Sequence, residues 1–143
     1  MKKVADVLDR KYPQFNTVLP DCLVSDALYQ MSCENVDFLI VLEDEKLLGI
    51  LSDHDIATKV LFAPKPLNQT HVREFMSSPF PIVSENDSIQ HCMQIAERYH
   101  AQHIVVYDCF SFKGVVTMHD LMTYALNIRA GVLEQEESFQ WNY

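Results

Sequence analysis

The first half of the chain has a regular order of apolar and polar positions. Residues 23–33 carry apolar side chains at helical spacing, so an amphipathic helix is expected there. The short apolar runs 38–42 and 47–51 predict two strands, joined by the charged turn between them. Ser52 then opens a second helix that is expected to run to about residue 62, and residues 4–8 predict a short helical lead.

The same order returns 65 residues further along the chain. Segment 49–56 reads Gly-Ile-Leu-Ser-Asp-His-Asp-Ile, and segment 114–121 reads Gly-Val-Val-Thr-Met-His-Asp-Leu. Without a gap, this offset also pairs identical residues elsewhere: Phe15 with Phe80, Val18 with Val83, Val41 with Val106, Thr58 with Thr123 and Leu61 with Leu126. The second copy therefore predicts a lead helix, a helix, two strands and a closing helix at residues 72–76, 88–100, 103–107, 112–116 and 117–127.

Each copy reads as strand, helix, strand, strand, helix, which places the chain in the α/β (α+β) class. The expected organisation is a first unit at 1–63, a proline-containing linker at 64–70, a second unit at 71–130 and an acidic, then aromatic tail at 131–143. Units of about sixty residues bury little surface alone, so the two are expected to pack pseudo-symmetrically through their sheets. The tail is interpreted as either a disordered or a docking segment.

The most specific local feature is Ser52-x-x-Asp55, repeated as Thr117-x-x-Asp120. Both copies lie where an apolar strand becomes a helix. One interpretation is a capping box, in which the hydroxyl and the acid satisfy backbone N–H groups at the helix start. The other is a ligand site, because a helix N-terminus attracts phosphate and an acid one turn later can accept hydrogen bonds from sugar hydroxyls.

A glycine precedes both motifs by three residues. Gly49 and Gly114 are expected to leave room for a ligand close to the strand. Glycine, two apolar residues, Ser or Thr, two variable residues and Asp, occurring twice over two such units, resembles a tandem pair of CBS domains, also called a Bateman module. The resemblance covers about residues 1–127, nearly the whole chain.

The resemblance implies roles for particular residues. In CBS pairs the motif acid binds the ribose and the Ser or Thr approaches the phosphate, which implies these roles for Asp55 and Asp120 and for Ser52 and Thr117. The adenine would be held by the other repeat, at its first strand–helix turn and at the entry to its second strand. For Thr117 and Asp120 these positions are Cys22, Ala27, Val36, Asp37 and Phe38. For Ser52 and Asp55 they are Asp87, Cys92, Ala101, Gln102 and His103.

The charges around the motifs differ from those of family members that bind nucleotides well, which usually add Arg or Lys near the phosphates. No Lys or Arg lies between the motif positions, and Asp37, Asp53 and Asp87 would repel phosphate. A monophosphate or phosphate-free ligand is therefore expected to bind better than ATP. The site of Thr117 and Asp120 is expected to be the better of the two.

The resemblance implies a non-catalytic regulatory protein that binds AMP or a related adenosine compound between its two units, with ADP, ATP, NAD and S-adenosylmethionine as further ligands of the same chemistry. No cofactor is required. A homodimer and an unidentified regulated protein are the expected partners. The alternative is a dimeric CBS scaffold that binds no ligand, in which the motifs survive only as helix caps.

Net charge and the absence of leader segments narrow the other possibilities. The formal charge of −9 disfavours nucleic acid and anionic membranes as partners. The chain has no apolar run of membrane-spanning length and no secretory leader, so a cytoplasmic protein is expected. Its four cysteines, Cys22, Cys33, Cys92 and Cys109, are expected to be reduced and mostly buried.

Catalytic and metal-binding patterns are weak. The sequence contains no nucleophile elbow, no P-loop and no dinucleotide glycine fingerprint. His100-x-x-His103 and the dipeptides formed by His54 and His119 with the following Asp contain metal-ligand types. The first pair spans a helix end and a strand start, so these histidines are interpreted as solvated or core residues.

Overall fold

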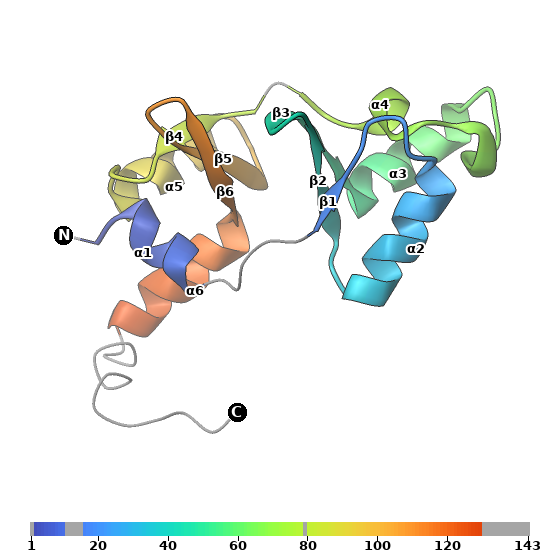
Figure 1. Ribbon diagram of the computed structural model, residues 1–143. Coiled ribbons are helices and arrows are strands. Elements are labelled where there is room, and N and C mark those ends of the chain that lie inside the picture. Colours follow the sequence, from blue (N-terminus) through green and yellow to red (C-terminus); the bar gives the residue numbers. More distant parts are fainter. Residues whose placement is uncertain (1, 11–15, 79, 130–143) are drawn as a thin grey trace. The chain divides into compact units, whose positions relative to one another are not determined.

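The computed structural model describes residues 2–10, 16–78 and 80–129, which form two compact units (Figure 1). One unit is formed by a single continuous segment of the chain, and its described residues are 16–78 and 80. The described part of the other joins residues 2–10 to residues 81–129. The tail at 131–143 lies outside the described residues, so its predicted role stays a prediction.

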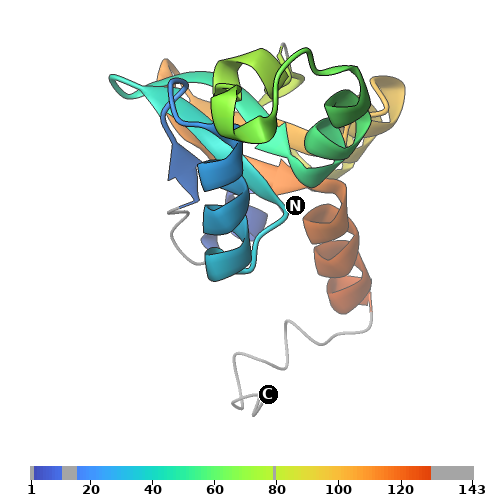
Figure 2. The same cartoon turned by 90° about the vertical axis from the view of Figure 1, so that its right-hand side faces the viewer.

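The continuous unit contains a three-stranded sheet in the order β1-β2-β3. Its strands are β1 (Thr17–Val18), β2 (Phe38–Glu43) and β3 (Lys46–Ser52). Strand β1 runs parallel to β2, and β2 runs antiparallel to β3. Helices α2 (Val24–Glu34), α3 (Asp53–Lys59) and α4 (Val72–Phe75) lie on one face of this sheet in Figure 1, and stand in front of it when viewed from that side in Figure 2. Two 3₁₀ turns, η1 (Val60–Phe62) and η2 (Leu67–Gln69), connect α3 to α4.

The alternation of side chains along the strands and their spacing along the helices determine which residues form the core of this unit. Leu39 and Val41 point to the same face of β2, because side chains alternate along a strand. They pack in one cluster with Ala27 of α2 and Ile56 of α3. Burial of this apolar face provides the main favourable free energy that holds the helices on the sheet.

The second unit repeats this architecture with the sheet order β4-β5-β6. Its strands are β4 (Ile82–Ser84), β5 (His103–Asp108) and β6 (Ser111–Thr117). Its helices are α1 (Val4–Asp9), α5 (Ile89–Arg98) and α6 (Met118–Arg129). The buried cluster again takes alternate strand residues, here Ile104 and Val106, together with Cys92 of α5 and Leu121 of α6. The mixed α/β class predicted from the repeat is confirmed.

The two lead helices are exchanged between the sequence repeats. Helix α1 comes before the first repeat in the chain but packs in the unit of the second, where the N–H of Val4 donates to the carbonyl of Asp87 at 2.8 Å. Helix α4 comes before the second repeat but packs on the first, where the N–H of Val72 donates to the carbonyl of Cys22 at 2.8 Å. The compact units are therefore cut differently from the sequence ranges 1–63 and 71–130.

Three details differ from the sequence-based expectations. The helix expected to run from Ser52 to residue 62 ends at Lys59, and a 3₁₀ turn follows it. The linker is part of a unit, because Thr70 is 1% exposed and its carbonyl accepts the N–H of Val24. Cysteines 33 and 109 are exposed rather than buried, the first on the outer face of α2 and the second in the β5–β6 turn.

Candidate functional site

The junction between β3 and α3 is a complete capping box. Ser52 is the N-cap residue, and its hydroxyl oxygen accepts the backbone N–H of Asp55 at 3.0 Å. In return, the Oδ2 atom of Asp55 accepts the backbone N–H of Ser52 at 3.0 Å and its hydroxyl at 2.9 Å. These bonds satisfy N–H groups that a helix start leaves without a partner within the helix.

The second carboxylate oxygen of Asp55 is also engaged. Its Oδ1 atom accepts the hydroxyl of Ser77 at 2.6 Å and lies 3.9 Å from the Nζ atom of Lys59. Ser52 is 6% exposed and Asp55 is 9% exposed, so the pair is buried. At the first junction the two motif side chains therefore bond within the protein rather than facing solvent.

Gly49 has a different role from the one expected. A Cβ atom at this position would lie 2.8 Å from the Sδ atom of Met76 and 2.9 Å from the carbonyl oxygen of Ser77. The space beside the strand is therefore filled by the chain itself, and the expectation that this glycine leaves room for a ligand is wrong. Gly49 and Gly114 also occupy equivalent places beside a β-bulge, opposite Val41 and Val106.

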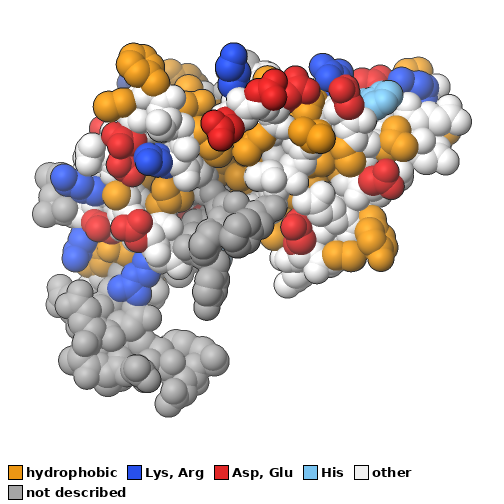
Figure 3. Space-filling model, viewed as in Figure 1, with side chains coloured by type: hydrophobic (Ala, Val, Ile, Leu, Met, Phe, Trp, Pro, Cys, Tyr) orange, Lys and Arg blue, Asp and Glu red, His pale blue; other side chains and the backbone are white. Residues whose placement is uncertain are grey.

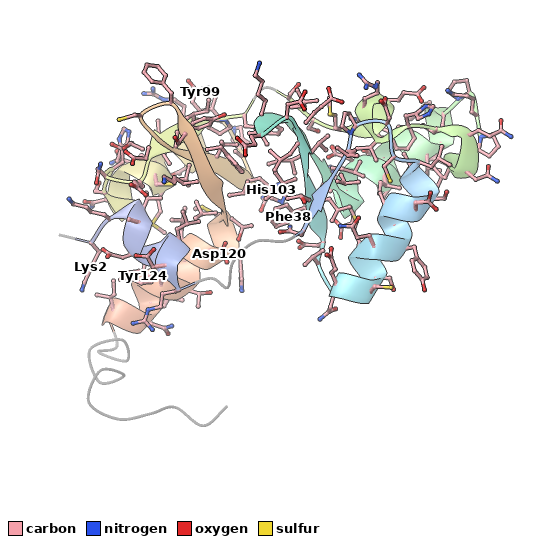
Figure 4. All side chains as sticks on the ribbon, in the orientation of Figure 1. Lys2, Phe38, Tyr99, His103, Asp120 and Tyr124 are labelled. Carbon is pink, nitrogen blue, oxygen red and sulfur yellow. The ribbon has the colours of Figure 1, made fainter. Side chains whose placement is uncertain are left out.

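The second junction, between β6 and α6, has the same cap in a more open setting. The Oγ1 atom of Thr117 accepts the backbone N–H of Asp120 at 3.0 Å, and the Oδ2 atom of Asp120 accepts the backbone N–H of Thr117 at 2.9 Å. Both residues are partly exposed, unlike Ser52 and Asp55. Figure 4 shows Asp120 where β6 passes into α6.

The adenine-side positions in the continuous unit differ in accessibility. Ala27 is fully buried and Phe38 is 6% exposed. Cys22 and Val36 are half-buried, and Asp37 is exposed. Ala27 thus serves the core, while Asp37 presents its side chain to solvent.

The corresponding positions in the other unit show the same range. Cys92 is fully buried, and Gln102 is exposed. Asp87, Ala101 and His103 are half-buried. The Oδ2 atom of Asp87 accepts the backbone N–H of Ser84 at 2.9 Å, so this carboxylate also closes the turn before α5.

In each unit, the first residue of the middle strand lies opposite the hydroxyl residue of the same unit's motif. Phe38 pairs with Ser52 across β2 and β3, and His103 pairs with Thr117 across β5 and β6. The carbonyl of Asp37 accepts the N–H of Asp53 at 2.9 Å. The carbonyl of Gln102 likewise accepts the N–H of Met118 at 3.1 Å.

The two cysteines near these positions have shifted pKa values. Burial, with a smaller contribution from the charge of Asp87, raises the pKa of the Cys92 thiol to about 11. Burial, followed by the charge of Asp26, also raises the pKa of Cys22. Both groups are held as neutral thiols, which makes them poor nucleophiles.

The contacts of Ser77 and Lys59 with Asp55 were not predicted from the sequence. Ser77 lies 22 residues from Asp55 in the chain, and a serine after a short helix has no pattern that links it to a particular acid. Lys59 follows Asp55 by one helical turn, a spacing that could have indicated an ion pair.

The described residues contain no arrangement typical of a metal site or a membrane span, and none typical of a basic surface on the face that Figure 3 presents. No group of three or more His, Cys, Asp or Glu side chains is placed to hold a metal ion. On the face shown in Figure 3, the described Lys and Arg side chains are scattered among acidic ones and form no continuous basic patch. None of the described helices combines the length and apolar character needed to cross a bilayer.

Comparison with known proteins identifies consistent relatives. Residues 4–61 and 72–127 each match the family model of the CBS domain. The CBS domain-containing protein YhcV of Bacillus subtilis is 28% identical over 118 residues, covering 82% of this chain and 84% of YhcV. The crystal structure of the CBS domain of NE2398 is 31% identical, with a TM-score of 0.81, covering 88% of this chain and 99% of that one. The structure of CBSX2 in complex with AMP shares the fold at 22% identity and a TM-score of 0.73, covering 90% and 99% of the two chains.

Proposed function

The chain belongs to the CBS domain family as a tandem pair, and we propose that it is a non-catalytic regulatory protein that binds AMP or a related adenosine compound. The observation that carries this proposal is the pair formed by Thr117 and Asp120. Reciprocal hydrogen bonds hold the two side chains at the start of α6, and their partial exposure leaves them accessible to a small molecule. The AMP complex of CBSX2, a protein of the same fold, supports the choice of ligand class.

The chemistry of this junction suits a ribose with a short phosphate chain. The carboxylate of Asp120 is half-buried rather than fully buried, and its oxygens are acceptors of the kind that suits a vicinal sugar hydroxyl. The N-terminus of α6, a helix of 12 residues, favours a phosphate group. Because Met118 and His119 separate the motif residues, no Lys or Arg there is available for a second or third phosphate.

A thermal-shift panel tests the proposal. AMP, ADP, ATP, NAD and S-adenosylmethionine are each added to the purified protein, and AMP is expected to raise the melting temperature. The Asp120→Ala variant should lose this shift. The Glu45→Gln variant, which removes an exposed charge in the β2–β3 turn, should keep it.

Calorimetry separates AMP from ATP. At equal magnesium, AMP is expected to bind more tightly, since the additional phosphates of ATP meet no cation between the motif residues. Tighter binding of ATP would contradict the proposed ligand preference. A panel in which every ligand leaves the melting temperature unchanged would favour the alternative function, a dimeric scaffold without a ligand.

A further inference from the structure

Asp55 already binds an alcohol supplied by the protein. The hydroxyl of Ser77 donates to its Oδ1 atom at 2.6 Å, while Oδ2 accepts two hydrogen bonds from Ser52. A ribose hydroxyl would offer the same chemical group to the same oxygen. With three of about four acceptor sites in use and 9% of the residue exposed, the carboxylate has little capacity for a sugar.

Residues 75–77, here called the latch, are fixed by several further contacts. The N–H of Ser77 donates to the carbonyl of Ile50 at 2.8 Å, and the N–H of Ile50 donates to the carbonyl of Ser77 at 3.1 Å. The Nζ atom of Lys59 donates to the carbonyl of Phe75 at 2.6 Å. The latch is thus an added piece of backbone on β3, and Gly49 permits its close approach.

We infer that the latch closes the first junction and that the protein therefore binds a single ligand, at Thr117 and Asp120. This inference rests on the proposed function, because it assigns the adenosine ligand to one of the two repeats. A ligand at Asp55 would have to displace Ser77, which competes at the high effective concentration of an intramolecular group. The two backbone hydrogen bonds between Ser77 and Ile50 hold this hydroxyl against Asp55, so the hydroxyl itself is the group that blocks the oxygen.

The two junctions differ in the features that the inference requires. The first is closed by a segment that lies beyond its own repeat, and both of its motif side chains are buried. At the second, Thr117 and Asp120 keep the capping geometry but are partly exposed. Equivalent sequence motifs are therefore expected to have unequal functions.

Isothermal titration with AMP tests the number of sites. The wild-type chain should bind one equivalent, and Asp120→Asn should bind none. Ser77→Ala should bind two equivalents, because the variant frees the Oδ1 atom of Asp55. The double variant Ser77→Ala, Asp120→Asn should bind one, at the opened first junction. Ser78→Ala, which changes the exposed neighbouring serine, should behave as wild type.

Gly49→Ala gives a second way to open the latch. Its Cβ atom would lie 2.9 Å from the carbonyl oxygen of Ser77, so the backbone of the latch must shift. Circular dichroism first establishes that each variant is folded. If Ser77→Ala fails to fold, Gly49→Ala replaces it and should likewise bind two equivalents.

The outcomes distinguish this inference from the proposed function. Two equivalents on the wild-type chain, or one retained by Asp120→Asn, would overturn the latch while leaving an adenosine-binding protein. A folded Ser77→Ala chain that still binds one equivalent would overturn it too. If the wild-type chain binds no AMP, the proposed function itself fails.

Discussion

Asp55 and Asp120 occupy equivalent sequence positions but have different surroundings. The carboxylate of Asp55 accepts three hydrogen bonds, from Ser52 and Ser77, and is buried. Asp120 is half-buried and shares a reciprocal cap with Thr117. The same acid can thus contribute more to stability in one repeat and remain more accessible in the other.

Alanine variants should separate these contributions in the absence of ligand. Asp55→Ala is expected to lower the free energy of unfolding by about 2–4 kcal/mol, because it removes a cap and leaves buried donors without an acceptor. Asp120→Ala should cost about 1 kcal/mol, the usual value of a helix cap. Urea denaturation followed by circular dichroism measures both. Equal losses would contradict the difference in burial described above.

The buried thiol of Cys92 makes stability depend on alkaline pH. Its pKa is about 11 in the folded protein against an ordinary value of 9.0, so between these values the native state holds a proton that the unfolded state releases. The stabilisation is complete below pH 9 and is lost as the pH rises toward 11.

The Cys92→Ala variant isolates this effect from other groups that titrate at high pH. Between pH 8 and pH 10.5, the wild-type chain should lose about 1–2 kcal/mol more unfolding free energy than the variant. Urea denaturation at the two pH values provides the comparison. Parallel losses in the two proteins would show that the thiol is not the group responsible.

The helices and strands were largely predictable because their signals are local. The apolar run at 103–107 is found as β5 (His103–Asp108), and the helical pattern at 23–33 is found as α2 (Val24–Glu34). The helix predicted to reach residue 62 was too long because apolar spacing continues into a 3₁₀ turn, which periodicity alone does not distinguish. At the site, the repeat identified the hydroxyl–acid pairs, but a contact between residues 22 positions apart, such as Ser77 and Asp55, leaves no local pattern.

The β2–β3 hairpin contains a turn whose residues do not suit its backbone. Asp44 and Glu45 have φ angles of 53° and 65°, a left-handed pair that favours Asn and Gly. The double variant Asp44→Asn, Glu45→Gly should therefore raise the unfolding free energy by about 1 kcal/mol. The double variant Asp44→Asn, Glu45→Ala is the matched control, since it removes the same two charges but keeps a Cβ atom at the positive φ of residue 45. Stabilisation by the control of the same size would assign the gain to charge instead.

At the scale of the whole molecule, the exchange of lead helices decides which pieces of the chain can fold alone. Val4 and Val72 are the first residues of their helices and both are 0% exposed, so an apolar lead helix does not by itself indicate which repeat it covers. The structure places Val72 and Phe75 of α4 in the core of the first repeat. A fragment cut at the sequence boundary after residue 63 therefore lacks part of its core.

Two fragments of similar length make this argument testable. Residues 13–80 contain the complete cluster with α4, and should show a cooperative thermal transition by circular dichroism. Residues 1–63 keep the motif of Ser52 and Asp55 but lose Val72, Phe75 and the Ser77 bond, so they should lack that transition. The fragment 13–80 with Val72→Ala and Phe75→Ala is the matched control, and is expected to behave like 1–63, because two buried side chains are worth several kcal/mol in a domain of this size. Cooperative folding of 1–63 would mean that α4 is dispensable, and that the first repeat is stable without the helix the structure places on it.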